Sequence, residues 1–143
     1  EAVAVPSEVL PALPADTPQA TYGHPSPLPH LDGTIVVAGP LSLRPEDPYY
    51  SYSKIFRRSL ELFARWLNYE RGGIVVRGVR YGMRFRWVGD GSSRTQVANA
   101  TAHALRQGCA DFAISGYSSG LTLYAAKQSH ADGKLMLSAG AAS

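Results

Sequence analysis

The sequence predicts an α/β domain: a parallel sheet with helices on both faces, in the order βαβαβαβ. Short apolar runs typical of strands alternate with longer amphipathic runs typical of helices, and the connections between them are short. The first apolar run is rich in β-branched residues and has no polar face, as expected of a strand that is buried on both sides. Crossovers between such parallel strands are right-handed. We place this domain at residues 32–143.

The first 31 residues have a different composition. Seven of the ten prolines lie within residues 1–30. Each proline fixes φ and lacks a backbone donor, so neither a helix nor a central strand can continue through them. We predict an extended tail or linker with some polyproline II character. No apolar run approaches the roughly 18 residues of a membrane span, and a signal peptide, if one existed, has been removed before Glu1.

The first half of the domain begins with a predicted strand at residues 33–39, bounded by glycines. A loop with three prolines precedes a predicted helix at residues 50–69. Arginine followed by two glycines at residues 71–73 is typical of a helix C-terminus. The apolar face of this helix repeats at three- and four-residue steps; it consists of Tyr52, Ile55, Phe56, Leu60, Phe63 and Leu67.

The second half begins with a strand at residues 83–88, where Arg84 and Arg86 alternate with apolar residues, as in an edge strand. A helix at 94–107, a strand at 111–115, a helix at 119–131 and a strand at 134–138 follow. The apolar side of the helix at 94–107 comprises Val97, Ala98, Ala102 and Leu105. Parallel sheets bind ligands at the carboxyl ends of their strands. Those ends are residues 39–42, 89–92, 116–120 and 139–143.

Several functional classes are disfavoured. The net charge is +3, and the arginines are spread over solvated faces rather than gathered into a nucleic-acid footprint. The glycine patterns of dinucleotide and nucleoside triphosphate sites are absent, which leaves Asp90 as a turn or cap residue. Cys109 is the only cysteine, predicted to be a buried or half-buried thiol, and the four histidines lack ligand-like spacing. We therefore expect no cofactor and no metal.

Residues 116–120 (GYSSG) follow a predicted strand and begin a predicted helix. They match the G-x-S-x-G nucleophile elbow, with Ser118 as nucleophile. A hydrolase also needs an acid and a histidine downstream, and His130, the sole candidate, belongs at the far end of the same helix. Two other interpretations stay open. Ser118 or Ser119 caps the helix, or the helix N-terminus and both hydroxyls bind an anion.

The chain also carries an ordered series of short motifs. A strand at 35–37 precedes Gly39, Pro40, Leu41 and Ser42, and an aromatic residue follows at Tyr52. The first helix is closed by Asn68 and by residues 72–74. The later strands are followed by residues 90–92, 116–119 and 138–141. In this order they resemble the type I periplasmic binding proteins, particularly the branched-chain amino-acid binding group and related receptor ligand-binding domains. The resemblance covers residues 33–143.

The resemblance implies a non-enzymatic binding fold whose two lobes close on a small polar ligand. Carried over by position, the ligand carboxylate would meet Ser119 and the backbone of residues 140–142, and Tyr52 would lie near the cleft. Two departures are notable: Ala142 stands where the family usually has a hydroxylated residue, and the loop 43–50 is longer than usual. The expected ligand-binding set is Ser42, Tyr52, Ser118, Ser119, Gly140, Ala141 and Ala142.

In the family a second lobe and hinge would follow Ser143. We therefore expect part of a larger extracellular or periplasmic protein, a transport component or a receptor, whose cleft is completed by a second lobe or another protein chain. The alternative is a structural or assembly module that keeps the fold without binding a ligand. Residues 99–101 form an N-glycosylation sequon, so Asn99 is a candidate site for a glycan.

Overall fold

A computed structural model describes residues 30–138, 140 and 141. Most of the predicted tail, and Ala142, lie outside the described residues. The elements, in chain order, are β1 (Gly33–Leu41), α1 (Tyr50–Arg65), η1 (Trp66–Glu70), β2 (Ile74–Val76), β3 (Val79–Gly89), α2 (Arg94–Gln107), β4 (Phe112–Ile114), α3 (Ser119–Ala131) and β5 (Met136–Leu137).

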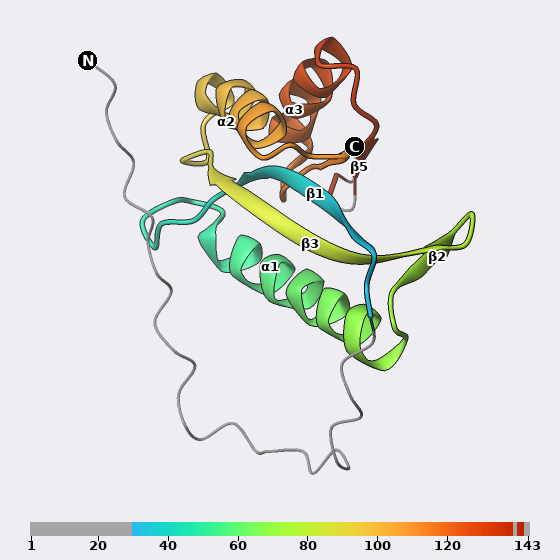
Figure 1. The fold of residues 1–143 in the computed structure, drawn as a ribbon. Helices are drawn as coiled ribbons and strands as arrows, with labels where there is room; N and C mark the ends of the chain where they lie inside the picture. Colours follow the sequence, from blue (N-terminus) through green and yellow to red (C-terminus); the bar gives the residue numbers. More distant parts are fainter. Residues whose placement is uncertain (1–29, 139, 142–143) are drawn as a thin grey trace, which may run out of the picture.

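These elements form the predicted α/β fold. The described strands make one sheet in the order β2-β3-β1-β4-β5, in which β1 pairs in parallel with β3 and β4, and β4 with β5. Helix α1 covers one face of the sheet, and α2 and α3 cover the other (Figure 1). Both faces of β1 are therefore shielded from water, which explains why its sequence is apolar without alternation.

The predicted boundaries of the last two helices agree with the structure. The first helix is α-helical only to Arg65 and continues as a π-helical turn, η1, which ends before Gly72 and Gly73. Both glycines have positive φ, 69° and 85°, so the chain turns out of the helix as predicted. The last strand is shorter than predicted, two residues against five, and β1 extends two residues further, to Leu41.

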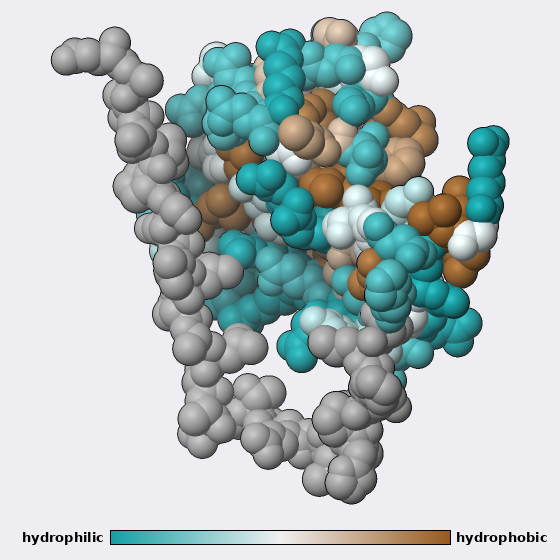
Figure 2. All heavy atoms as spheres, viewed as in Figure 1, coloured by the Kyte–Doolittle hydropathy of each residue, from teal (hydrophilic) through white to brown (hydrophobic). Residues whose placement is uncertain are grey.

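The sequence reasoning missed one strand. β2 pairs antiparallel with the start of β3, and Arg77 and Gly78 connect them with φ of 51° and 82°. Two successive residues with positive φ are the requirement of a type I′ hairpin turn. The hairpin exposes apolar side chains, visible beside β2 in Figure 2, namely Val75, Val76 and Val79. β2 is thus the outermost strand, although it reaches only residues 79–81 of β3, and the rest of β3 is an edge as predicted.

The core lies between the sheet and the α2–α3 layer. Val36 and Ala38 of β1 pack against Ala104 and Leu105 of α2. Two corrections concern this region. Ala98 and Ala102 were expected in the apolar face of α2 but are only half-buried; its buried residues are Val97, Ala100, Thr101, Ala104 and Leu105. Cys109 is exposed rather than buried, because it lies in the turn after α2 with a positive φ of 46°.

Candidate functional site

Backbone segments from three strand ends come into close contact at the carboxyl edge of the sheet. A Cβ on Gly39 would overlap the carbonyl oxygen of Ile114, and one on Gly116 would lie 2.9 Å from the carbonyl oxygen of Pro40. A Cβ on Gly140 would lie 3.0 Å from the carbonyl oxygen of Gly116. Glycine at these positions lets the ends of β1, β4 and β5 meet without side chains between them. The predicted site residues on these loops are thereby brought together.

Helix α3 begins at this edge. Ser118, the residue before it, has a φ of 103° and makes no side-chain capping hydrogen bond. The Thr122 N–H donates to the Ser118 carbonyl oxygen at 2.9 Å, as the first backbone bond of the helix. The amides of Gly120 and Leu121 precede this bond and have no acceptor within the helix, and together with the helix dipole they favour a negative charge at this end. The hydroxyl of Ser118 does not satisfy them.

A cationic side chain lies beside the same helix terminus. The Nη2 and Nε atoms of Arg94 are 3.5 and 3.6 Å from the position that a Cβ on Gly120 would take. Arg94 is the first residue of α2, is exposed, and has no carboxylate partner among the described residues. A guanidinium next to the positive end of a helix is the electrostatic pattern of an anion site. Arg94 could not be identified from the sequence, because the proximity of α2 to the start of α3 depends on tertiary packing.

Two tyrosines form an aromatic surface at the same edge. The ring of Tyr52, from α1, stacks on that of Tyr117 with centroids 4.3 Å apart and an interplanar angle of 7°. Both remain partly exposed, at 52% and 39%. The ring of Tyr49 lies tilted beside that of Tyr117, with the ring centroids 6.1 Å apart. The structure therefore places Tyr52 beside the GYSSG motif. Tyr117 was not chosen from the sequence, although it belongs to the GYSSG motif.

A buried carboxylate ties the loop after β1 to the loop after β3. Asp90 is 2% exposed; it accepts hydrogen bonds from the Ser42 hydroxyl at 2.9 Å and from the Ser92 N–H at 2.8 Å. The Ser92 hydroxyl in turn accepts from the Tyr49 N–H at 3.1 Å. Burial raises the pKa of Asp90 above 3.8, and these hydrogen bonds oppose the rise. Ser42 is buried and its hydroxyl is directed at Asp90, so its place in the structure is that of a loop-positioning residue.

Of the remaining predicted residues, Gly140 packs against the loop after β4, Ala141 is exposed, and Ala142 lies outside the described residues. His130 is twelve residues from Ser118 along α3, a rise of about 18 Å, so the two cannot form a catalytic pair. The described residues contain no cluster of three potential metal-ligating side chains. None of their helices is long and apolar enough to cross a membrane.

No protein-family profile matches the chain, and no curated protein is similar to it at a significant level. Solved structures do match. One is the branched-chain amino acid transporter substrate binding protein of Streptococcus pneumoniae in complex with isoleucine, with a TM-score of 0.63 at 18% identity over 77% of this chain. Another is a branched-chain amino acid transporter of the ABC type from Rhodopseudomonas palustris, with a TM-score of 0.57 at 19% identity over 78% of this chain.

A third is a type 1 periplasmic binding protein of Bordetella pertussis, with a TM-score of 0.54 at 20% identity over 75% of this chain. This chain spans only 30%, 28% and 26% of the three matched chains. Identities this low bear on the fold alone. The resemblance of the sequence to type I periplasmic binding proteins is thus confirmed as a likeness of fold, which covers part of one lobe.

Proposed function

We propose that this chain, which has the fold of part of one lobe of a type I periplasmic binding protein, forms one side of a binding site for a small carboxylate-bearing solute such as an amino acid. The observation that carries the proposal is the pairing of the α3 N-terminus with the guanidinium of Arg94 at the carboxyl edge of the sheet. This edge is where open α/β sheets bind ligands. The function is binding rather than catalysis.

In the proposed arrangement the ligand carboxylate lies at the start of α3. The amides of its first turn, Ser118, Ser119 and the backbone of Gly140 and Ala141 surround it, and Arg94 supplies a charge-assisted hydrogen bond. The exposed faces of Tyr52 and Tyr117 offer an apolar surface for the ligand side chain. Asp90 and Ser42 hold the neighbouring loops in place.

One lobe supplies only half of a closed cleft. Small-molecule sites ordinarily bury 70–90% of their ligand, which requires a second wall from another lobe or chain. We therefore propose that a second lobe or a partner chain completes the site, and expect the present chain to bind an amino acid with a dissociation constant of about 1 mM or weaker. The proposal includes an extracellular or periplasmic location. Asn99, exposed on α2, is accessible to glycosylation there.

Isothermal titration calorimetry of the chain against the twenty amino acids tests this function. We expect saturable binding by a subset that includes isoleucine, the ligand of the Streptococcus structure. Arg94→Ala and Ser119→Ala should each weaken binding about tenfold, the equivalent of one charge-assisted hydrogen bond. Lys127→Ala, an exposed cation elsewhere on α3, should leave it unchanged. Absence of binding by all twenty, or equal affinity in the Arg94 and Lys127 variants, would overturn the proposal.

The assembly module is the second candidate, because α1 leaves several large apolar side chains exposed. Its exposed large side chains are Tyr52, Ile55, Leu62 and Phe63, followed in η1 by Trp66 and Tyr69. Exposed large apolar side chains that gather on one surface commonly mark protein interfaces. An assembly module would show a concentration-dependent mass in light scattering and no heat with any amino acid, whereas a solute-binding lobe gives the reverse.

A further inference from the structure

One edge of β3 is open along most of its length. β1 pairs with the other edge over residues 81–89, whereas β2 reaches only residues 79–81. At Met83 the side chain of Asn68 takes the place of a strand. The Met83 N–H donates to Asn68 Oδ1 at 2.8 Å, and Asn68 Nδ2 donates to the Met83 carbonyl oxygen at 2.9 Å. This is the pair of bonds that a neighbouring strand would form.

The open edge continues beyond that point. Backbone groups alternate in direction along a strand, so the N–H and C=O groups of Phe85 and Trp87 face the same side as those of Met83. Among the described residues no strand lies there. An edge with several free ladder groups is a site at which an extended segment can add as a further strand.

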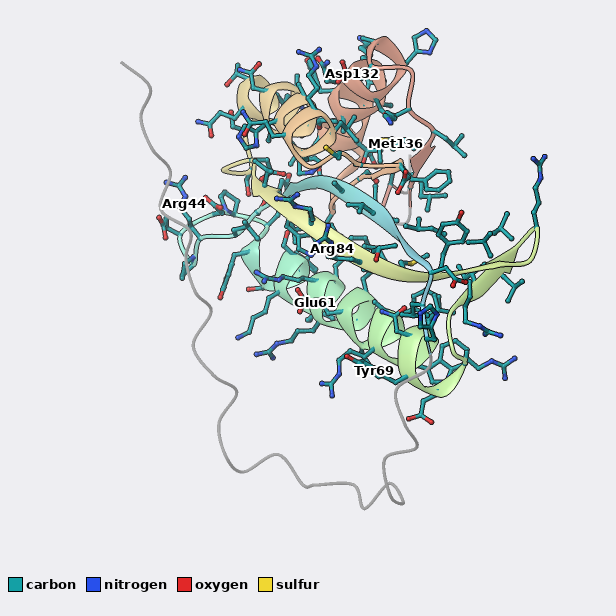
Figure 3. The ribbon with its side chains drawn as sticks, viewed as in Figure 1. Arg44, Glu61, Tyr69, Arg84, Asp132 and Met136 are labelled. Atoms are coloured by element: carbon teal, nitrogen blue, oxygen red, sulfur yellow. The ribbon has the colours of Figure 1, made fainter. Side chains whose placement is uncertain are left out.

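A groove follows this edge. It has a volume of about 420 Å³ and lies between α1 and β3. Its lining includes Leu31, Ala64 and Phe85, together with the charged residues Glu61, Arg65 and Arg84. Figure 3 shows Glu61 on α1 and Arg84 on β3, on the two sides of this region. A segment bound here would thus have the groove and Phe85 on one side, and the side chains of Arg84 and Arg86, which alternate with Phe85, on the other.

The charge at this edge is positive. Arg57 bonds to Glu61 at 2.7 Å and neutralises it. Arg65, Arg84 and Arg86 are exposed and have no carboxylate partner among the described residues. Pairing of this edge with the same edge of a second copy would bring like charges together, which is unfavourable. An extended segment that carries a carboxylate is the occupant that fits.

The chain itself contains such a segment. Residues 1–29 include three acidic residues and no Lys or Arg, whereas all fourteen Lys and Arg lie later. This segment joins the described domain at the groove, because Leu31 is part of the groove lining. Residues 7–10 (SEVL) form a proline-free stretch in which Glu8 and Val9 would point to opposite faces of a strand. In residues 1–5 (EAVAV) the acid would share its face with both valines, and only alanines would remain on the opposite face.

We propose that residues 7–10 dock on the open edge of β3 as an added strand. Val9 then faces the groove over Phe85, and Glu8 lies on the opposite side, with Arg84 and Arg86. The length of chain suffices: the nineteen residues between Leu10 and His30 span about 60 Å when extended, against about 10 Å from Gly82 to Phe85 along β3. The N-terminal segment would thereby protect an edge that otherwise invites aggregation.

The single cysteine gives a direct test on the full chain. Cys109 is exposed and follows Gly108, whose carbonyl oxygen accepts a hydrogen bond from Arg86 at 3.3 Å. A nitroxide spin label on Cys109 therefore lies near the β3 edge. In NMR spectra we expect it to broaden the amide signals of residues 8–10 more than those of residues 17–21, which are closer to the domain in sequence. Broadening that falls smoothly with sequence distance from residue 30 would overturn the proposal.

Two comparisons make the result specific. Glu8→Arg should abolish the broadening at residues 8–10 and raise the amide hydrogen exchange of Phe85 and Trp87 about tenfold, whereas Glu1→Arg should change neither. A mixed sample distinguishes docking within one chain from docking between two copies. It combines isotope-labelled chain that carries no nitroxide with chain that carries the nitroxide but no isotope label. Broadening in that mixture would mean that the segment comes from a second copy, which contradicts docking within one chain.

Discussion

Asp90 connects two loops of the proposed site, and its removal has a calculable effect. In Asp90→Ala the Ser92 N–H loses its acceptor, and the Ser42 hydroxyl keeps only the Ser92 hydroxyl, 2.8 Å away. Leaving a buried donor unsatisfied costs about 1–3 kcal/mol. Loss of the buried charge offsets part of this cost. We expect a net loss of about 1–2 kcal/mol in the free energy of unfolding, a fall in Tm of roughly 5–12 °C for a domain of this size.

Asp90→Asn separates the hydrogen bonds from the charge. The amide oxygen of asparagine can accept both bonds, so at pH 7 this variant should lie within about 1 kcal/mol of the parent. The sign of the pH dependence follows from the raised pKa. The folded state favours neutral Asp90, so its ionisation reduces stability as pH rises from 3.8 through the folded-state pKa. Asp90→Asn should lack this decline.

Urea unfolding followed by circular dichroism between pH 3.5 and 7 measures both effects. Glu46→Ala is the matched control, because Glu46 is an exposed acid in the same loop region with a weak 3.6 Å contact to Arg44. We expect it to change stability by less than about 0.5 kcal/mol. If Asp90→Ala were as harmless as the control, or if Asp90→Asn were as damaging as the alanine variant, the assigned role of this carboxylate would be wrong.

Two further predictions concern the sheet. Gly39→Ala should lower the free energy of unfolding by more than about 3 kcal/mol, because its Cβ would overlap a carbonyl oxygen of β4. Gly89→Ala is the control and should change Tm little, because the atom nearest to its Cβ would be 4.0 Å away. Equal Tm values for the two variants would contradict the close contact at the site. Asn68→Ala should lower the free energy of unfolding by about 1–3 kcal/mol, because both hydrogen bonds to the backbone of Met83 are lost. Its control is Asn99→Ala, which should be neutral in the same assay because Asn99 is exposed on α2.

Much of the fold could be predicted because local signals agree with the tertiary structure. Helix α3 begins within the GYSSG motif, at Ser119, and ends before Gly133, whose φ is 65°, so its limits are encoded in the sequence itself. The β2–β3 hairpin escaped notice because its turn contains Arg77 with positive φ, where asparagine or aspartate gives the usual signal. The three apolar residues of β2 are also too few to show the alternation of apolar and polar side chains that identifies a strand.

The site was only partly predictable for a different reason. The carboxyl ends of the strands follow from the order of elements, which directed attention to Ser118, whereas Tyr52 was singled out by the family resemblance. The position of Arg94 beside Gly120 depends on how α2 and α3 pack, and the burial of Asp90 depends on two loops that meet in space. Neither has a local sequence signal. Ser42 illustrates the limit, since the motif that singled it out did not show that its hydroxyl faces Asp90.

The central claim is that the start of α3 binds the carboxylate of a small solute. NMR titration of the isotope-labelled chain with L-isoleucine, and in parallel with isoleucine amide, tests it most directly, because the amide lacks only the negative charge. We predict saturable shifts of the Gly120, Leu121 and Gly140 amides with isoleucine, absent with the amide and in Arg94→Ala. Identical shifts with both compounds, or shifts confined to other parts of the chain, would contradict the claim.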